Sequence, residues 1–153
     1  MIKVLVSSCL LGSPVRWDGG DKKSDHPILQ RWLEEGRLVS VCPEMLGGLG
    51  TPRPPSEIVA DGSRRVMTSG GRDVTVAFQQ GAAAAVAETE AHGVRVAILK
   101  EASPSCGSSF IYDGTFTSTR LPGEGITADL LGRDLRCRIL HDHDSRRRGR
   151  QRS

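Results

Sequence analysis

Short apolar runs alternate with amphipathic stretches along the chain. Four runs are rich in β-branched and aliphatic residues, which is typical of strands buried in a sheet. The predicted strands are residues 2–8, 37–42, 94–100 and 135–140. Three other stretches repeat apolar residues at the spacing of an amphipathic helix. The predicted helices are residues 27–35, 72–92 and 127–133.

Capping and turn residues indicate where these elements begin and end. Asp25 is a candidate cap for the first helix, and Thr127 is a candidate cap for the last one. Asp-Gly pairs predict two hairpins, one within residues 57–68 and one within residues 110–116. The prolines and glycines of residues 43–57 predict a long loop without regular structure.

The order of these elements is strand, helix, strand, loop, helix, strand, hairpin, helix, strand. Such alternation predicts an α/β fold, a single domain with a largely parallel sheet flanked by helices. A chain of 153 residues is long enough to bury the core of one ordinary domain. We expect this domain to cover residues 1–142, and residues 143–153 to form a basic, disordered tail.

Composition and charge narrow the classes of function. Hydrophobic residues make up 37% of the chain and charged residues 25%, as in soluble globular proteins. The formal net charge is +3, but five arginines lie between Arg146 and Arg152, so the rest of the chain carries −2. A nucleic-acid-binding arm has such a composition, but a solvated end is the favoured interpretation. Aromatic residues are only 4%, which argues against a surface on which bases stack.

The sequence shows no segment typical of membrane insertion or export. No stretch approaches the roughly 20 consecutive apolar residues that span a bilayer. The apolar run at the N-terminus is too short for a signal peptide. We therefore expect a cytoplasmic protein with no membrane partner, in which a reducing environment disfavours disulfides among the four cysteines.

Three of the cysteines lie at the ends of predicted strands. Cys9, Cys42 and Cys106 each end or follow a different strand. The carboxyl ends of parallel strands meet at one edge of an α/β sheet, where ligand crevices form. We therefore expect the three thiols to lie together there. Cys137 falls inside the predicted strand 135–140 and is interpreted as a structural residue, because unpaired cysteine is often buried as a small hydrophobe.

Three thiolates at one edge of a sheet suit more than one ligand. A zinc ion with one open position and a [4Fe–4S] cluster with one iron free of protein ligands both accept three cysteines. Three unrelated buried cysteines are the remaining interpretation. The residues by themselves do not choose among these.

Polar residues in the same loops are candidates for catalysis. Glu44 lies two residues after Cys42 and is either a proton-transfer group or a solvated loop charge. Ser103 lies three residues before Cys106 and could orient water or substrate, although a serine before proline more often forms a turn. Arg53 lies between two prolines and either faces an anion or anchors a loop through carbonyl groups.

Three further residues near these loops have an ordinary structural interpretation. Lys100 and Glu101 follow one another at the end of a predicted strand; either could reach the site, but a surface pair is the favoured interpretation. Trp17 could line a pocket for a flat ring, but packing within its loop is an equal alternative.

Six segments together resemble the DUF523 family, which includes bacterial thiouracil desulfidases. The segments are SSCLLG (7–12), RWDGG (16–20), CPEMLGGLGTPRPPSEI (42–58), GRDVT (71–75), ILKEASPSCGSSFIYDGTF (98–116) and GEGITADLL (123–131). The combination of SSCLLG, CPE…GGL…PRxP and SPSCG is specific, and the resemblance spans roughly residues 2–140. This chain has Trp17 where the family often has tyrosine.

The resemblance implies an α/β protein that carries a [4Fe–4S] cluster on three cysteines, which match Cys9, Cys42 and Cys106. It implies that the free iron binds the sulfur of a small thiolated compound, such as 2-thiouracil. A glutamate and a serine assist the hydrolysis and match Glu44 and Ser103. We expect Ser103 to orient the attacking water and Glu44 to deprotonate it. The implied products are the oxo compound and sulfide, with no redox change.

Two other functions compete with this interpretation. The protein could be a non-catalytic module that holds zinc or sulfide, such as a sulfur carrier for a partner enzyme. Thiolated RNA could also be the substrate, with the arginine tail as its anchor. The natural substrate, the sulfur acceptor and the oligomeric state do not follow from the sequence.

Overall fold

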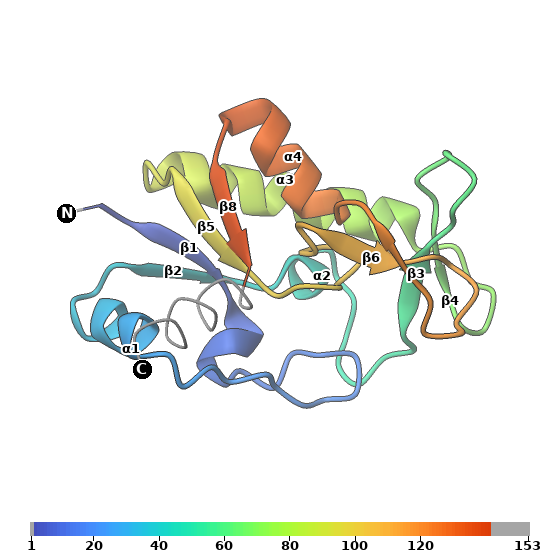
Figure 1. Ribbon diagram of the computed structural model, residues 1–153, viewed down its shortest axis with the longest axis horizontal. Helices are drawn as coiled ribbons and strands as arrows, with labels where there is room; N and C mark the ends of the chain where they lie inside the picture. Colours follow the sequence, from blue (N-terminus) through green and yellow to red (C-terminus); the bar gives the residue numbers. More distant parts are fainter. Residues whose placement is uncertain (1, 142–153) are drawn as a thin grey trace.

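The computed structural model describes residues 2–141. The predicted domain boundary at residue 142 and the predicted tail, residues 143–153, lie outside the described residues. Within the described chain, the architecture is a four-stranded parallel sheet with helices on both faces and two small hairpins beyond one edge (Figure 1).

The four strands of the central sheet are those that the hydrophobic pattern predicts. They are β1 (Val4–Ser7), β2 (Leu38–Val41), β5 (Val96–Leu99) and β8 (Arg138–His141). All neighbouring pairs are parallel, in the order β2-β1-β5-β8. The prediction of an α/β fold with a parallel sheet is therefore confirmed, and every strand ends at the same edge.

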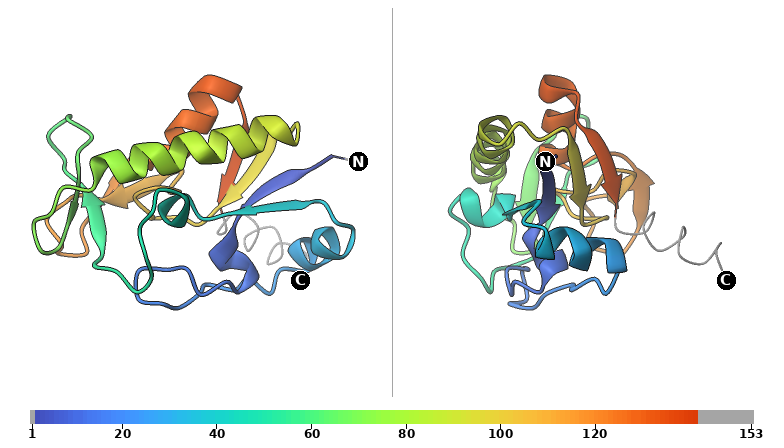
Figure 2. Two further views of the ribbon diagram at one scale, coloured as in Figure 1. Left: turned by 180° about the vertical axis from the view of Figure 1, so that it is seen from behind. Right: turned by 90° about the vertical axis from the view of Figure 1, so that its left-hand side faces the viewer.

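Helices cover both faces of this sheet. Helix α1 (Pro27–Glu34) packs on one face, whereas α3 (Thr75–Ala91) and α4 (Ile126–Leu135) pack on the other (Figure 2). The strand side chains alternate accordingly, because successive residues of a strand point to opposite faces. On β1, Leu5 belongs to the core under α3 and α4, while Val4 and Val6 belong to the core under α1.

Two helix caps differ from the prediction. The ring of His26, rather than Asp25, accepts the N–H of Ile28 at the start of α1, at 3.1 Å. Helix α4 begins one residue before Thr127, with Gly125 as its cap. The backbone N–H of Thr127 instead bonds a loop carbonyl, so this residue serves the contact between the helix and that loop.

Residues 43–57 contain a short helix that the sequence does not predict. Helix α2 (Pro43–Leu46) follows β2 directly, and Gly47 ends it. Proline suits the first position of a helix, because its missing N–H would have no partner there in any case. A second short element, the 3-10 turn η1 (Ser8–Leu11), follows β1 in the same way.

Two antiparallel hairpins lie beyond the carboxyl edge of the sheet, each with its predicted Asp-Gly pair in the connecting loop. The second extends past the predicted residues 110–116, because its return strand is residues 120–122. One joins β3 (Ser56–Ile58) to β4 (Val66–Thr68), and the other joins β6 (Phe110–Tyr112) to β7 (Arg120–Pro122). A third apolar cluster, centred on the buried Phe78 of α3, packs beneath them. The hairpins thus face the strand ends.

The helices of the described residues are short or polar. None of those within residues 2–141 combines the length and the apolar character that crossing a bilayer requires.

Candidate active site

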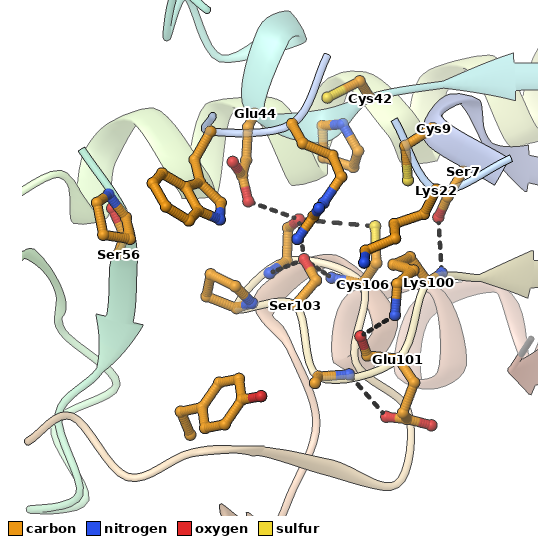
Figure 3. Close-up of a pocket in the computed structure, with 18 of the residues that line it drawn as sticks. Ser7, Cys9, Lys22, Cys42, Glu44, Ser56, Lys100, Glu101, Ser103 and Cys106 are labelled. Carbon is orange, nitrogen blue, oxygen red and sulfur yellow. Dashed lines mark hydrogen bonds between the residues drawn. The ribbon is translucent and has the colours of Figure 1, made fainter. Parts of the chain in front are cut away.

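A cavity of about 540 Å³ lies between the carboxyl edge of the sheet and the two hairpins. Cys9, Cys42, Cys106, Glu44 and Ser103 all line it (Figure 3). The structure therefore brings together every residue that the sequence marks as a candidate ligand or catalytic group.

Each cysteine reaches the cavity from a different strand end. Cys9 lies in η1 after β1, Cys42 is the residue between β2 and α2, and Cys106 lies in the loop after β5. Figure 3 shows Cys9 and Cys106 with their sulfur atoms turned toward one another, and Cys42 on the same side of the cavity as Cys9. Cys9 and Cys106 are buried, and Cys42 is partly so.

Cys137 takes no part in this site. It lies just before β8 rather than inside the strand, and it packs in the core under α3 and α4. Its thiol donates to the carbonyl of Val94, at 3.8 Å. This placement agrees with the structural role that the sequence suggests.

The protein surroundings favour the neutral form of the cavity thiols. Burial raises the pKa of the Cys106 thiol to about 12, although hydrogen bonds from Ser7 and Ser105 act in the opposite direction. Burial likewise raises the pKa of Cys42. A bound cation would favour the thiolate at Cys42 and Cys106, since desolvation disfavours an uncompensated charge.

An ion pair fixes the carboxylate of Glu44. Arg53 donates to Oε2 of Glu44 from Nε, at 2.9 Å, and from its second terminal nitrogen as well. The same guanidinium donates to the carbonyls of Val15 and Gly50, at 2.9 and 3.0 Å. The two alternatives for Arg53, anion contact and loop anchor, are thus both realised. Oε1 of Glu44 stays directed at the opposite loop.

That opposite loop presents two serines. The hydroxyl of Ser103 accepts the backbone N–H groups of Ser105 and Cys106, both at 3.1 Å. It also lies 3.0 Å from the hydroxyl of Ser105, which in turn lies 3.3 Å from Oε1 of Glu44. A continuous hydrogen-bonded chain therefore joins Ser103 to Glu44. Sequence reasoning missed Ser105, although its place next to Cys106 is a signal.

Glu101 stabilises the loop that carries Ser103, Ser105 and Cys106. The sequence predicts a surface pair with Lys100, but the Glu101 side chain is only 2% exposed. Its Oε1 accepts four backbone N–H groups, from Ala102, Ser108, Ser109 and Phe110, at 2.9–3.2 Å. The prediction was wrong because the loop turns back over the end of β5 and surrounds this carboxylate.

The outer wall of the cavity is aromatic. Four of the six aromatic residues of the chain line it: Trp17, Phe110, Tyr112 and Phe116. The guanidinium of Arg120 lies over the ring of Phe110, 4.4 Å from its centroid. The low aromatic content argued against stacking on bases, but the few rings are concentrated at this one place. The segment FIYDGTF carries three of them directly after the cysteine loop.

The sequence and fold match one family throughout. A model of the 2-thiouracil desulfurase family matches residues 4–142. The chain belongs to the 2-thiouracil desulfurase family. One curated relative of this chain is the Bacillus subtilis (strain 168) protein named "Uncharacterized protein YbbK". The two are 42% identical over an alignment of 135 residues, and the match covers 84% of this chain and 88% of the relative.

A solved structure extends this comparison to the fold. This desulfurase-family chain is similar to the [4Fe-4S]-dependent thiouracil desulfidase TudS (DUF523Vcz), with a TM-score of 0.88 and 44% identity. The match covers 94% of this chain and 93% of the other. The resemblance to DUF523 seen in the sequence is therefore confirmed, for the whole described domain.

Proposed function

We propose that this protein converts a thiouracil-like base and water to the oxo base and sulfide, by a non-redox reaction. Cys9, Cys42 and Cys106 would hold a [4Fe–4S] cluster. The observation that carries this proposal is the convergence of three cysteines, from three strand ends, on a cavity that also contains Glu44 and Ser103. Family membership and the similarity to TudS support it.

The donor set of the cavity fits such a cluster. Within residues 2–141, no three His, Cys, Asp or Glu side chains are close enough to share a single metal ion. A cluster does not require that, because each cysteine binds a different iron atom. Three thiols from three separate segments are the soft donors that an iron–sulfur cluster takes from a protein.

The bound cluster would supply a Lewis acid that polarises the thiocarbonyl carbon toward attack by water. The chain supplies the rest of the site. Trp17, Phe110, Tyr112 and Phe116 offer ring faces for a planar base, which stacks on aromatic side chains. We place the C=S group at the cysteine end of the cavity. The attacking water then lies beside Ser103 and Glu44.

Glu44 accepts the proton that the water loses. Arg53 occupies Oε2, whereas Oε1 accepts only the long hydrogen bond from Ser105, at 3.3 Å. The carboxylate is only 13% exposed, so few competing water molecules reach it. Orientation by a fixed ion pair lowers the entropic cost of the transfer, because the acceptor does not have to find its geometry at the moment of reaction.

The test is turnover of 2-thiouracil by anaerobically reconstituted protein, measured as uracil and sulfide. We expect Glu44→Gln to keep its iron and lose at least about 100-fold in kcat, the usual contribution of a general base. Glu34, which is exposed on α1, supplies the matched control Glu34→Gln, and we expect it to behave like the wild type. A Glu44→Gln protein with wild-type turnover would show that the carboxylate has another role.

Iron-loaded wild-type protein that converts no thiolated base would refute the catalytic proposal. It would favour a non-catalytic metal- or sulfur-binding module.

A further inference from the structure

The direction of one hydrogen bond at the site follows from counting lone pairs. A serine hydroxyl has one hydrogen to donate and two lone pairs. In Ser103 both lone pairs accept backbone N–H groups, those of Ser105 and Cys106. Its hydroxyl therefore has to be the donor toward Ser105 Oγ, 3.0 Å away. A water molecule can donate a hydrogen bond to the Ser103 oxygen only when the Ser103 proton leaves, because both lone pairs are otherwise occupied.

Ser105 has two candidate acceptors for its own hydrogen. Oε1 of Glu44 lies at 3.3 Å, and Sγ of Cys106 lies at 3.6 Å. The hydroxyls of Ser7 and Ser105 both lower the pKa of the Cys106 thiol, so Ser105 is not its only polar neighbour. The carboxylate is the stronger acceptor, because hydrogen bonds to a charged group are about twice as strong as neutral ones. The 3.3 Å separation is long for a hydroxyl, as is common at catalytic contacts before substrate binds.

We propose that Ser105 relays a proton from Ser103 to Glu44 during desulfuration. This inference rests on the proposed function and deepens it. Ser103 is the group that touches the water, and Ser105 acts through Ser103 as a positioning and relay residue. The sequence-based expectation that Ser103 merely orients the water is thereby replaced by a directed chain, Ser103 to Ser105 to Glu44.

The relay step is balanced in protons and electrons. As the water oxygen forms its bond to the thiocarbonyl carbon, the π bond of C=S breaks and its electron pair moves to sulfur, while one O–H bond of the water breaks. The proton goes to Oγ of Ser103, the proton of Ser103 goes to Oγ of Ser105, and the proton of Ser105 goes to Oε1 of Glu44. Each hydroxyl loses one proton and gains one, so only the carboxylate changes its protonation state. The two N–H groups on Ser103 stabilise the negative charge that develops there.

The burial of these hydrogen-bonded side chains favours proton transfer through Ser105 over proton transfer through solvent. Ser105 is 2% exposed and the side chain of Glu44 is 13% exposed, so little bulk water reaches the link between them. Ser103 is partly exposed and lines the cavity, so the end of the hydrogen-bonded chain that receives the proton from water faces the substrate.

The experiment compares reconstituted full-length wild type with Ser105→Ala, Ser103→Ala and the double variant. For Ser105→Ala we expect kcat to fall about 100-fold while KM stays within twofold. Iron content and the visible spectrum should stay unchanged. The double variant should be no slower than the slower single variant, within about threefold, because both changes break the same chain. Ser105→Thr retains a hydroxyl and should restore most of the rate.

Several outcomes would overturn the relay. Ser105→Ala with normal kcat in an active wild-type background refutes it and leaves the proposed function intact. A shifted spectrum or reduction potential with normal kcat would show that Ser105 donates to Cys106 instead, since hydrogen bonds to cluster sulfurs tune the potential. Multiplicative losses in the double variant would also contradict it.

A shape-matched pair guards against a folding defect in Ser105→Ala. Ser105→Thr and Ser105→Val have the same shape and differ in the hydroxyl, so equal kcat values for these two contradict the relay. A wild-type protein without turnover refutes the proposed function, and the relay falls with it.

Discussion

Glu101 illustrates how a single buried carboxylate supports the site without entering the cavity chemistry. Burial raises its pKa, but the backbone N–H groups of Ser109, Phe110, Ala102 and Ser108 together outweigh burial and lower the pKa below its usual value. The charged form is therefore the one that the folded loop stabilises. Loss of this charge weakens the frame on which Ser103 and Cys106 are held.

The pH dependence of stability tests this role. The folded-state pKa of Glu101 lies below its unfolded value, so its contribution is complete above the unfolded pKa, about 4.3. It is lost as the pH falls through the folded pKa. We expect Glu101→Gln to lower the free energy of unfolding by about 1–3 kcal/mol at pH 7, with a difference from the wild type that shrinks below about pH 4.

Chemical denaturation at a series of pH values measures this difference. Glu34→Gln, on an exposed part of α1, should show almost no difference from the wild type across the same range. A Glu101→Gln penalty that is constant from pH 7 to pH 3 would mean that shape rather than charge is what the loop needs.

At the scale of elements, the start of helix α4 holds the cysteine loop in place. The first N–H groups of a helix have no partner within it. Here three of them bond loop carbonyls: Ile126 to Pro104 at 2.9 Å, and Thr127 and Ala128 to Ser105 at 2.9 and 3.1 Å. Gly125 makes this approach close enough, because a Cβ there would lie 2.5 Å from the carbonyl of Ser105.

We therefore expect Gly125→Ala to displace the loop that carries Ser105 and Cys106. Its backbone conformation suits alanine, with φ of −66°, so the cost comes from overpacking, typically about 1–3 kcal/mol. The melting temperature and the amount of iron that the protein takes up should both fall. Gly70→Ala is the matched control, since its Cβ would meet only Thr68, at 3.9 Å. Equal behaviour of the two variants would contradict a docking role for Gly125.

Elements were predictable from sequence where a hydrophobic period or a turn pair existed. Strand β5 is a continuous apolar run, helix α1 has an amphipathic period, and both hairpins have Asp-Gly pairs. Helix α2 was missed because four residues contain no full period. The cap of α4 was missed because the helix already begins at Ile126, where its first N–H groups bond carbonyls of the cysteine loop, and no local pattern encodes that tertiary contact.

At the scale of the whole molecule, strand order assembles the site. Cys9 and Cys106 are far apart in sequence, yet they follow β1 and β5, which are neighbours in the sheet. The rule that parallel strands end at one edge was enough to predict this meeting. It did not reveal Ser105, the aromatic wall or the buried state of Glu101. Those depend on how the loops fold back, which the sheet topology does not determine.

Comparison of cluster-loaded with iron-free protein tests whether the three strand ends share one bound group. A group bound only by the folded state raises the melting temperature, and here its ligands would come from three separate segments. We expect reconstituted protein to melt at least about 5 °C above the iron-free form, a shift that corresponds to roughly 1–2 kcal/mol for a domain of this size. Cys106→Ser should abolish both the iron uptake and the shift.

Cys137→Ala is the control for that experiment. It removes a thiol from the core rather than from the cavity, so we expect a lower melting temperature but normal iron uptake. Iron loss in Cys137→Ala would instead make this cysteine part of the metal site.

The placement of β5 between β1 and β8 has a consequence for biogenesis. When a ribosome has released only the first half of the chain, Cys9 and Cys42 are already present, but the third thiol and the strand that aligns it have not been made. The first half of the chain therefore lacks the complete set of proposed ligands. A cluster held by Cys9, Cys42 and Cys106 would be completed only after the loop that follows β5 has been translated.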